Sequence, residues 1–193
     1  MKKLLFATSN ANKLKEVREI LVNQYEVLSL KDIDWNEEIP EPYDTIRENS
    51  VYKANYFFEK MGIDCISEDS GLEVEALDGR PSAYSARYAG ESRDDIQNYE
   101  KVLAEMQGET NRTARFKSII TYKTVSICET FEGEMLGTIG FEPKGSNGFG
   151  YDPIFMHEGK NQTNAELTSE EKNAISHRKK ALAKLVAFFK TLG

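Results

Sequence analysis

The stretch CISEDSGLEVEALDGRPSAYSARYAG, residues 65–90, decides the fold. Its apolar start predicts a short strand at 63–66, after which Gly71 allows a left-handed backbone conformation. Residues 72–77 alternate with a period of two, which is typical of a strand, and the Asp-Gly pair at 78–79 predicts a turn. The stretch therefore predicts a strand, a break and a hairpin.

Two adjacent carboxylates, Glu68 and Asp69, fall in the predicted break. We expect them at the end of a strand, just before the hairpin. A solvated turn would account for acids in such a place, and so would a site that binds a metal ion or accepts a proton. The choice between these alternatives depends on the other polar residues of the chain.

Length and composition indicate one globular domain spanning residues 1–193, with room for two lobes. Hydrophobic residues make up 39% of the chain and charged residues 30%, as in a soluble protein. The net charge of −7 argues against a non-specific binder of nucleic acid or of membrane surfaces, because both need a basic face. A small anionic ligand held by a few local cations is still compatible with this charge.

Cysteine usage and the N-terminal residues bear on the cellular compartment. Cys65 and Cys128 lack metal-ligand spacing, and we interpret them as core thiols in a reducing cytosol. The apolar run at 4–7 is too short for a signal peptide and predicts a buried strand instead. No run approaches the length of a membrane-spanning helix.

The first twenty residues predict a strand at 2–7, a polar turn and a helix. The turn consists of Thr8, Ser9, Asn10, Ala11, Asn12 and Lys13, and apolar residues then recur at helical spacing. Asn10 is a candidate N-cap. A helix N-terminus beside hydroxyl groups and Lys13 can bind a phosphate, although an ordinary capped helix would have the same sequence.

An acidic loop, DIDWNEEIPE at 32–41, follows a second expected strand at 25–30. Carboxylate oxygens are ligands for hard cations such as Mg²⁺. The candidate ligands in this loop are Glu37, Glu38 and Glu41. The same charges would also suit a loop that is only solvated.

Two further helices are predicted from their apolar stripes, at 43–61 and at 94–106. Gly62 is expected to end the first of them. Asn49 and Lys53 are four residues apart in this helix, so we expect them to share a face that differs from the apolar stripe.

Strand-forming residues and a glycine-rich loop characterise the segment from 114 to 155. Residues 114–131 predict a long strand with a bulge or turn, and residues 133–141 would pair with it. The loop PKGSNGFGYDPIF at 143–155 combines glycines, which let backbone approach a ligand, with aromatic rings that can stack on a nucleobase. A tight hairpin with aromatic packing would explain the same residues.

A C-terminal helix is expected after the capping box at 168–171. Its inward face would carry Ile175, Leu182, Leu185 and Phe189. Its first turns contain Lys172, His177 and Arg178, any one of which would suit a solvated surface. Together with the alternation of strands and helices in the first half, this order predicts an α/β fold with a mixed β-sheet flanked by helices. The dispersed acids, cations and glycine loop suggest two lobes with a central cleft.

Five motifs together resemble the inosine triphosphate pyrophosphatase family over essentially the whole chain. They are ATSNANKLKE at 7–16, EN followed by KA at 48–54, SEDSGLEVEALDGRPSAYSARYAG at 67–90, GFGYDPIF at 148–155 and AELTSEEKNAISHR at 165–178. The resemblance implies an elongated α/β fold with a nucleotide-binding cleft, in a cytoplasmic homodimer. It also implies a Mg²⁺-dependent enzyme that converts inosine, deoxyinosine or xanthosine triphosphate to the monophosphate and pyrophosphate.

The resemblance further implies roles for individual residues. Asp69 would accept a proton and bind Mg²⁺, and Ser70 would touch the substrate. The triphosphate would be held by Thr8, Ser9, Asn10, Ala11, Asn12 and Lys13. The base and sugar would be bordered by Phe149, Gly150, Tyr151 and Asp152, and the nucleotide site would be completed by Lys172, His177 and Arg178.

The second metal ligand is assigned to Glu41, with Glu38 as the alternative. The family usually has a glutamate shortly before the EN motif, often followed by a glycine that this loop lacks. Ser9 and Ser50 stand where glycine and alanine are common, and neither difference removes a charge.

Three alternatives remain open beside this interpretation. The first is a related pyrophosphatase that acts on modified pyrimidine nucleotides, which a substrate panel would reveal. The second is a nucleotide-binding protein without turnover, against which the Asp69 carboxylate argues. The third is a structural or interaction module, which predicts no thermal shift with nucleotide and Mg²⁺.

Overall fold

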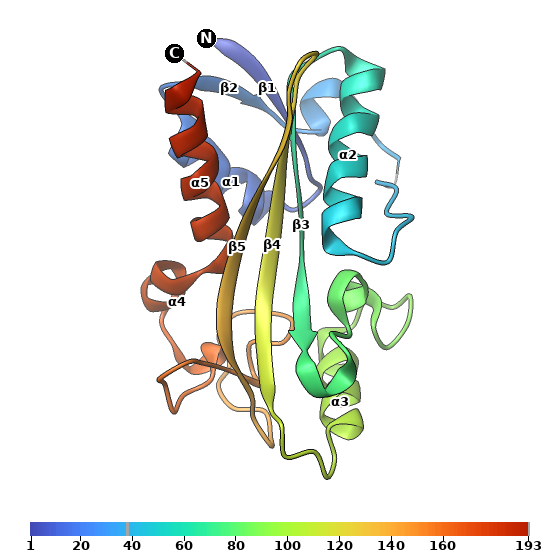
Figure 1. The fold of residues 1–193 in the computed structure, drawn as a ribbon, viewed down its shortest axis with the longest axis vertical. Helices are drawn as coiled ribbons and strands as arrows, with labels where there is room; N and C mark the ends of the chain where they lie inside the picture. The colour runs from blue at the N-terminus through green and yellow to red at the C-terminus, as the bar shows by residue number, and fades with distance from the viewer. Residues whose placement is uncertain (38, 193) are drawn as a thin grey trace. The chain divides into compact units, whose positions relative to one another are not determined.

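The computed structural model describes residues 1–37 and 39–192, without the side chains of Asn12 and Glu16. Within these residues the strands form a six-stranded sheet of order β2-β1-β3-β4-β5-β6 (Figure 1). The strands are β1 (Lys2–Ala7), β2 (Tyr25–Leu28), β3 (Cys65–Val74), β4 (Thr113–Lys123), β5 (Cys128–Ile139) and β6 (Phe155–His157). β1 is parallel to β2 and β3, whereas β5 and β6 are antiparallel, so the predicted mixed sheet is confirmed.

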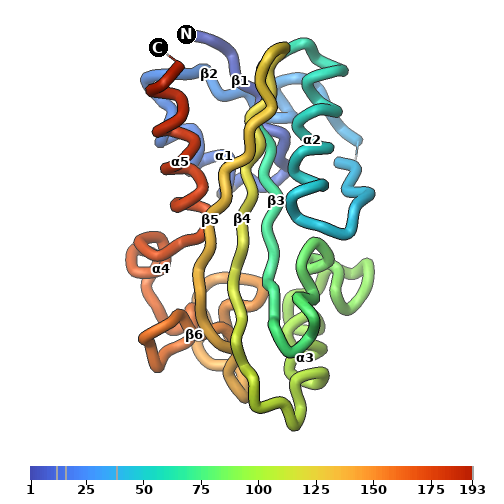
Figure 2. Tube along the Cα trace, in the orientation of Figure 1, coloured from blue at the N-terminus to red at the C-terminus, as the bar shows by residue number. Residues whose placement is uncertain are grey.

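Helices flank this sheet, and Figure 2 follows the chain through them. The α-helices are α1 (Ala11–Leu21), α2 (Ile46–Met61), α3 (Asp95–Glu105), α4 (Ser169–Ile175) and α5 (His177–Thr191). The 3₁₀ helices are η1 (Lys31–Ile33), η2 (Glu75–Leu77), η3 (Ser82–Arg87) and η4 (Asn164–Glu166). No helix in the described part of the chain has the length and apolar character needed to cross a membrane.

The chain forms two compact units, which are described separately here. Unit 1 contains Met1–Asp69, Ile119–Glu132 and Ala181–Gly193. Unit 2 contains Ser70–Ser118 and Gly133–Lys180. The single domain expected over residues 1–193 stays a prediction.

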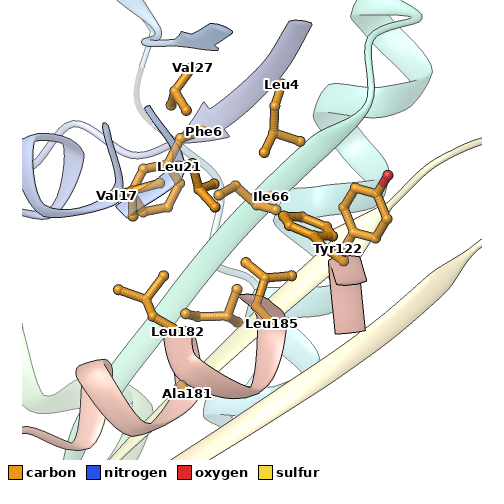
Figure 3. Packing of buried hydrophobic residues seen from close by; sticks show 12 residues of the cluster. Leu4, Phe6, Val17, Leu21, Val27, Ile66, Tyr122, Ala181, Leu182 and Leu185 are labelled. Atoms are coloured by element: carbon orange, nitrogen blue, oxygen red, sulfur yellow. The ribbon is translucent and has the colours of Figure 1, made fainter. Parts of the chain in front are cut away.

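Unit 1 has an apolar cluster on each face of its strands. Successive side chains of a strand point to opposite faces, so Leu4 and Phe6 of β1 join one cluster and Leu5 joins the other. The first cluster packs α1 and α5 against the sheet through Val17, Leu21, Leu182 and Leu185 (Figure 3). The second cluster packs α2 against the opposite face through Phe57. Figure 1 shows α2 on the other side of these strands from α1 and α5.

Unit 2 has its own buried cluster, to which β3, β5, β6 and α3 all contribute. Its members include Leu72, Val74, Val102, Met135, Ile139, Tyr151 and Phe155. Because Tyr151 belongs to this cluster, the glycine-rich loop is anchored in the core of unit 2.

The predicted break in the strand at 67–71 is wrong, because β3 is continuous from Cys65 to Val74. Glu68 and Asp69 therefore lie within a strand instead of at its end. Gly71 serves a close approach of two segments, since a Cβ atom there would lie 2.1 Å from the carbonyl oxygen of Ser82. The strand expected at 72–77 is also too long, because its last three residues form η2.

The turn at 78–79 is confirmed. The N–H of Gly79 donates to the carbonyl oxygen of Val74 at 2.9 Å, and Asp78 and Gly79 have φ angles of 54° and 82°. Gly62 ends α2 as predicted, with a φ of 64°. The long strand predicted at 114–131 is β4 followed by the start of β5, with a turn in which Thr124 Oγ1 accepts from the N–H of Ile127 at 3.0 Å.

The single C-terminal helix predicted after residue 168 is two helices, α4 and α5, separated by Ser176. The capping box of Thr168 and Glu171 is confirmed at the start of α4. Ser176 has a ψ of 130°, and its carbonyl oxygen accepts from the N–H of Lys180 at 3.1 Å at the start of α5. Serine is well suited to this position between two helices, because it can cap the new helix while it ends the previous one.

β6 pairs with residues 137–139 of β5, and the carbonyl oxygen of Leu136 accepts from the N–H of Glu158 at 2.9 Å. Before Leu136, this side of β5 has no partner strand among the described residues. Carbonyl oxygens nevertheless find donors on this side. Lys184 Nζ donates to the oxygen of Glu132 at 2.6 Å, and Lys180 Nζ donates to the oxygen of Glu134 at 2.8 Å. These two lysines of α5 therefore bind the backbone of β5.

Candidate functional site

The turn between β1 and α1 has the predicted helix cap. The N–H of Lys13 donates to Asn10 Oδ1 at 3.2 Å, and the N–H of Asn10 donates to Thr8 Oγ1 at 3.2 Å. Thr8 is half-buried, whereas Ser9, Asn10 and Ala11 are exposed. The N-cap is confirmed, phosphate binding stays a prediction, and the side chain of Asn12 lies outside the described part of the structure.

Lys53 is the buried centre of a charged cluster in unit 1. Its side chain comes from α2, and Nζ lies 2.8 Å from Glu41 Oε1 and 3.3 Å from Asp69 Oδ1. Nζ also donates to the carbonyl oxygen of Glu68 at 3.0 Å. Burial acts to lower the pKa of Lys53, but the charges of Asp69 and Glu41 outweigh it and raise that pKa. Lys53 is therefore a cation that joins two carboxylates.

The two carboxylate oxygens of Asp69 differ in their surroundings. Oδ1 faces Lys53, whereas Oδ2 is buried and has no hydrogen bond within the described part of the chain. Burial raises the pKa of Asp69, and the charge of Lys53 opposes that rise. A buried polar atom without a partner is uncommon, and it indicates a place for water, an ion or a ligand.

Glu68 and Asp69 point to opposite faces, because they are neighbours in one strand. Glu68 is buried and lies with Oε1 3.5 Å from Lys13 Nζ of α1. Asp69 lies instead against Lys53 of α2. β3 thus holds two carboxylates, each paired with a lysine from a helix on its own side.

Glu41 and Asp69 can take part in a magnesium site. Among the described residues, no three His, Cys, Asp or Glu side chains form a ready-made metal cage. Mg²⁺ is usually bound by one or two carboxylates together with water and substrate phosphates. The two carboxylates and the unpartnered Oδ2 of Asp69 fit that ion. The alternative ligand Glu38 lies outside the described residues.

Asp152 is the buried centre of a second cluster, in unit 2. Its Oδ2 accepts from the N–H of Phe149 at 2.9 Å and from Lys172 Nζ, and Oδ1 accepts from Asn164 Nδ2 at 3.3 Å. Lys172 Nζ also lies 4.7 Å from the centre of the Phe149 ring, which is 59% exposed. The exposed Phe149 ring thus lies next to the ion pair of Lys172 and the buried Asp152.

The close approach of the loop to Asp152 requires a glycine at 148. A Cβ atom on Gly148 would lie 2.2 Å from Asp152 Oδ2. The loop is also tied to other parts of unit 2, because the N–H of Gly150 donates to Asp95 Oδ2 at 2.8 Å. The buried Tyr151 donates its hydroxyl to the carbonyl oxygen of Ser85 at 2.7 Å. The glycine-rich loop is therefore held by contacts within the loop and by hydrogen bonds to Asp95 and Ser85.

Other predicted site residues lie at the start of α5 and in β3. His177 stacks on Phe116, with ring centres 5.2 Å apart and an interplanar angle of 12°. Arg178 follows it and is half-buried, as is Ser70 in β3. Their roles toward a ligand stay predictions.

Three residues of the two clusters were not assigned to a site from the sequence: Lys53, Glu68 and Asn164. The sequence signals for Lys53 were its place in the KA motif at 53–54 and its spacing from Asn49. The separate polar face expected for this pair is wrong, because Asn49 and Lys53 are buried on the same face as Phe57 of the apolar stripe. Glu68 was noticed as a carboxylate but not as the partner of Lys13. Asn164 gave no signal, because its contact with Asp152 joins segments that are separated in the sequence.

Comparisons with known proteins place these residues in a family context. The Ham1 family model matches residues 4–188. A protein of Flavobacterium psychrophilum named dITP/XTP pyrophosphatase is 46% identical and covers 97% of this chain and 98% of its own. A protein of Bacillus subtilis with the same name is 48% identical and covers 96% of each chain. The structure of the Staphylococcus aureus Ham1 protein superposes with a TM-score of 0.95 at 35% identity and covers 100% of both chains.

Proposed function

The chain belongs to the Ham1 family, and we propose on this premise that it hydrolyses non-canonical purine nucleoside triphosphates. The substrates would be inosine, deoxyinosine and xanthosine triphosphates, and the products the monophosphate and pyrophosphate. The relatives named above carry the name dITP/XTP pyrophosphatase at 46% and 48% identity, which supports this substrate class over pyrimidine nucleotides. The structural observation that carries the proposal is the buried, unpartnered Oδ2 of Asp69 beside Lys53.

Asp69 would act as the general base. Lys53 holds Oδ1 at 3.3 Å, which fixes the carboxylate and leaves Oδ2 to take a proton from water. The water oxygen would bond to the α-phosphorus as its proton passes to Asp69, and the bond to the bridging oxygen would break to release pyrophosphate. The burial that raises the pKa of Asp69 makes the carboxylate a better proton acceptor.

Lys13 and the α1 N-terminus would hold the phosphates. An ammonium group beside a helix N-terminus suits an anion, and Lys13 is only partly exposed. Its positive charge would offset the negative charge that develops on the leaving pyrophosphate. Glu68 would orient Lys13 through their 3.5 Å contact.

The metal ion in this proposal is Mg²⁺, held by Glu41 and Asp69. When bound, the ion would supply positive charge at the phosphate oxygens and so assist the loss of pyrophosphate. We also propose a cytoplasmic homodimer, as expected from the resemblance of the sequence motifs.

The base would be recognised by the residues of unit 2. The exposed ring of Phe149 can stack on a nucleobase, and Lys172 and Asp152 support that ring from one side. Arg178 and His177 would donate hydrogen bonds to the keto oxygen at C6 of hypoxanthine or xanthine.

The test is pyrophosphate release measured with a panel of nucleotides. We expect Mg²⁺-dependent release from inosine, deoxyinosine and xanthosine triphosphates that exceeds release from ATP and from modified pyrimidine nucleotides. Faster turnover of a pyrimidine substrate would contradict the proposal. So would a protein whose thermal stability rises with nucleotide and Mg²⁺ but which releases no pyrophosphate.

A further inference from the structure

Trp35 and Tyr43, at the two ends of the loop that carries Glu41, lie against a row of side chains on α2. These side chains are Asn49, Tyr52, Lys53, Tyr56 and Phe57, whose spacing of three and four residues places them on one face of the helix. At the start of the loop, the ring of Trp35 lies 5.9 Å from that of Tyr56 and 5.0 Å from that of Phe57. At its end, the ring of Tyr43 lies 5.6 Å from that of Tyr52. Both ends of the loop are thus fixed to the same helix face.

Asn49 connects this helix to the loop backbone through two hydrogen bonds. Its Oδ1 accepts from the N–H of Tyr43 at 2.9 Å, and its Nδ2 donates to the carbonyl oxygen of Tyr43 at 2.8 Å. The amide therefore pairs with both backbone polar groups of one residue. Asn49 is 0% exposed, so water does not compete for these bonds.

Glu41 lies two residues before Tyr43. Lys53 lies one helical turn after Asn49, and its Nζ contacts the Glu41 carboxylate at 2.8 Å. The Glu41 side chain is 30% exposed, so burial alone does not select its conformation. Its position depends on the backbone held by Asn49 and on the ion pair with Lys53. When the loop backbone and the ion pair are both fixed, the Glu41 carboxylate has little conformational freedom.

We propose that Asn49 is a positioning residue for metal binding, which acts by fixing the loop backbone so that Glu41 faces Asp69. This inference rests on the proposed role of Glu41 as a metal ligand. Groups that orient a metal ligand typically change metal affinity by about 10–100-fold when they are removed. A residue that served only to stabilise α2 would change the free energy of unfolding without changing metal affinity in the folded protein.

The experiment measures Mn²⁺ binding to the full chain without nucleotide, by the electron paramagnetic resonance signal of the unbound ion. Asn49→Ala removes both bonds to Tyr43. Asn49→Asp has the same shape and keeps the acceptor for the N–H, but it loses the donor, so it provides a second variant if Asn49→Ala does not fold. Asn55→Ala is the matched control, because Asn55 is on the same helix and its amide donates to the helix backbone, at the carbonyl oxygen of Val51. Glu41→Gln measures the affinity that the metal ligand itself contributes.

We expect Mn²⁺ affinity to fall about 10-fold in Asn49→Ala and less in Asn49→Asp, while Asn55→Ala stays at the wild-type value. We also expect excess Mg²⁺ to restore kcat in the Asn49 variants, with an unchanged KM for nucleotide once metal is saturating. Wild-type Mn²⁺ affinity in a folded Asn49→Ala or Asn49→Asp protein would overturn the inference. Unchanged affinity in Glu41→Gln would overturn it as well, because Asn49 acts through Glu41. The Glu41→Gln result would also remove Glu41 from the proposed metal site, but neither result decides the proposed activity, which is tested separately by pyrophosphate release from the wild-type enzyme.

Discussion

The Nζ atom of Lys53 lies 3.3 Å from Oδ1 of Asp69, and the other oxygen of that carboxylate is buried with no hydrogen-bond partner among the described residues. One oxygen is therefore held in place, and the proposed mechanism assigns proton transfer to the second. This proposed division of roles between the two oxygens underlies the first three predictions.

Replacing the proposed base should stop turnover without preventing binding. In Asp69→Asn the amide cannot accept a proton, and the loss of a general base alone is worth about 10²–10⁴-fold in rate. Pyrophosphate release should fall by at least this factor, while nucleotide binding measured by calorimetry persists. Near-normal turnover in a folded Asp69→Asn protein would show that another residue is the base.

Glu41→Gln should weaken activation by Mg²⁺ much more than Glu38→Gln does. The reason is that a neutral amide is a poor ligand for a hard cation, and Glu41 is the carboxylate joined to Asp69 through Lys53. The Mg²⁺ concentration for half-maximal activity measures the effect. EDTA should abolish turnover of the wild type, and added Mg²⁺ should restore it. Equal small effects of Glu41→Gln and Glu38→Gln would show that Glu41 is not a metal ligand.

Lys53→Met should destabilise the protein by about 3 kcal/mol, because it leaves two carboxylates without the cation that pairs with them. Urea unfolding at neutral pH measures the loss. Lys15→Met provides the control, since Lys15 is an exposed lysine of α1 whose contact with Glu19 is 3.9 Å long. A free energy of unfolding equal to that of the control would mean that the buried cluster does not need its lysine.

Arg178→Ala should reduce kcat/KM for inosine triphosphate far more than for ATP. A guanidinium only donates hydrogen bonds, so it can pair with the keto oxygen of hypoxanthine but not with the amino group of adenine. An unsatisfied buried donor costs about 1–3 kcal/mol, so the wild-type preference over ATP should be at least about tenfold. Guanine shares the keto group, and Arg178 therefore does not explain any rejection of GTP. Equal losses for both substrates would assign Arg178 to the phosphates or to the fold.

Asp32 should contribute stability at neutral pH that disappears in acid. Hydrogen bonds from the N–H and the hydroxyl of Ser29, both 2.7 Å long, lower the pKa of Asp32, and Arg18 adds to the effect. The charged form therefore stabilises the fold above the unfolded pKa of about 3.9, and this contribution is lost as the pH falls through the lower folded pKa. Asp32→Asn should be less stable than the wild type at pH 7, and urea unfolding should show the gap closing below about pH 4. A gap that stays constant with pH would contradict the assignment.

The sequence predicted those features whose signal is local. The Asn10 cap, the capping box of Thr168 and Glu171, and the end of α2 at Gly62 each depend on residues a few positions apart. The α/β class and the mixed sheet followed from the order of such elements. Local rules sufficed here because the hydrogen bonds that define these features are themselves local.

Features that depend on contacts between distant segments were missed. The strand β3 runs through polar residues because Ser67 donates to the carbonyl oxygen of Ser50 at 2.6 Å and Asp69 pairs with Lys53. Neither Ser50 nor Lys53 adjoins β3 in the sequence. The residues from Ser67 to Gly71 were therefore interpreted from their own composition, which is typical of a turn. Gly71 was similarly interpreted as a turn residue, although it serves the close approach of Ser82. The sequence therefore identified Glu41 and Asp69 as candidate site residues but not Lys53, the lysine that joins them.

The lysines that bind the backbone of β5 have a consequence for solubility. An open strand side with unpaired carbonyl oxygens is a template on which another polypeptide can add a strand, which is how many aggregates begin. Lys180 and Lys184 occupy two of these acceptors at Glu134 and Glu132, and they place positive charge where an incoming strand would have to dock. The C-terminal helix thereby shields the sheet from association with partly folded chains, a protection that would be lost whenever α5 detached.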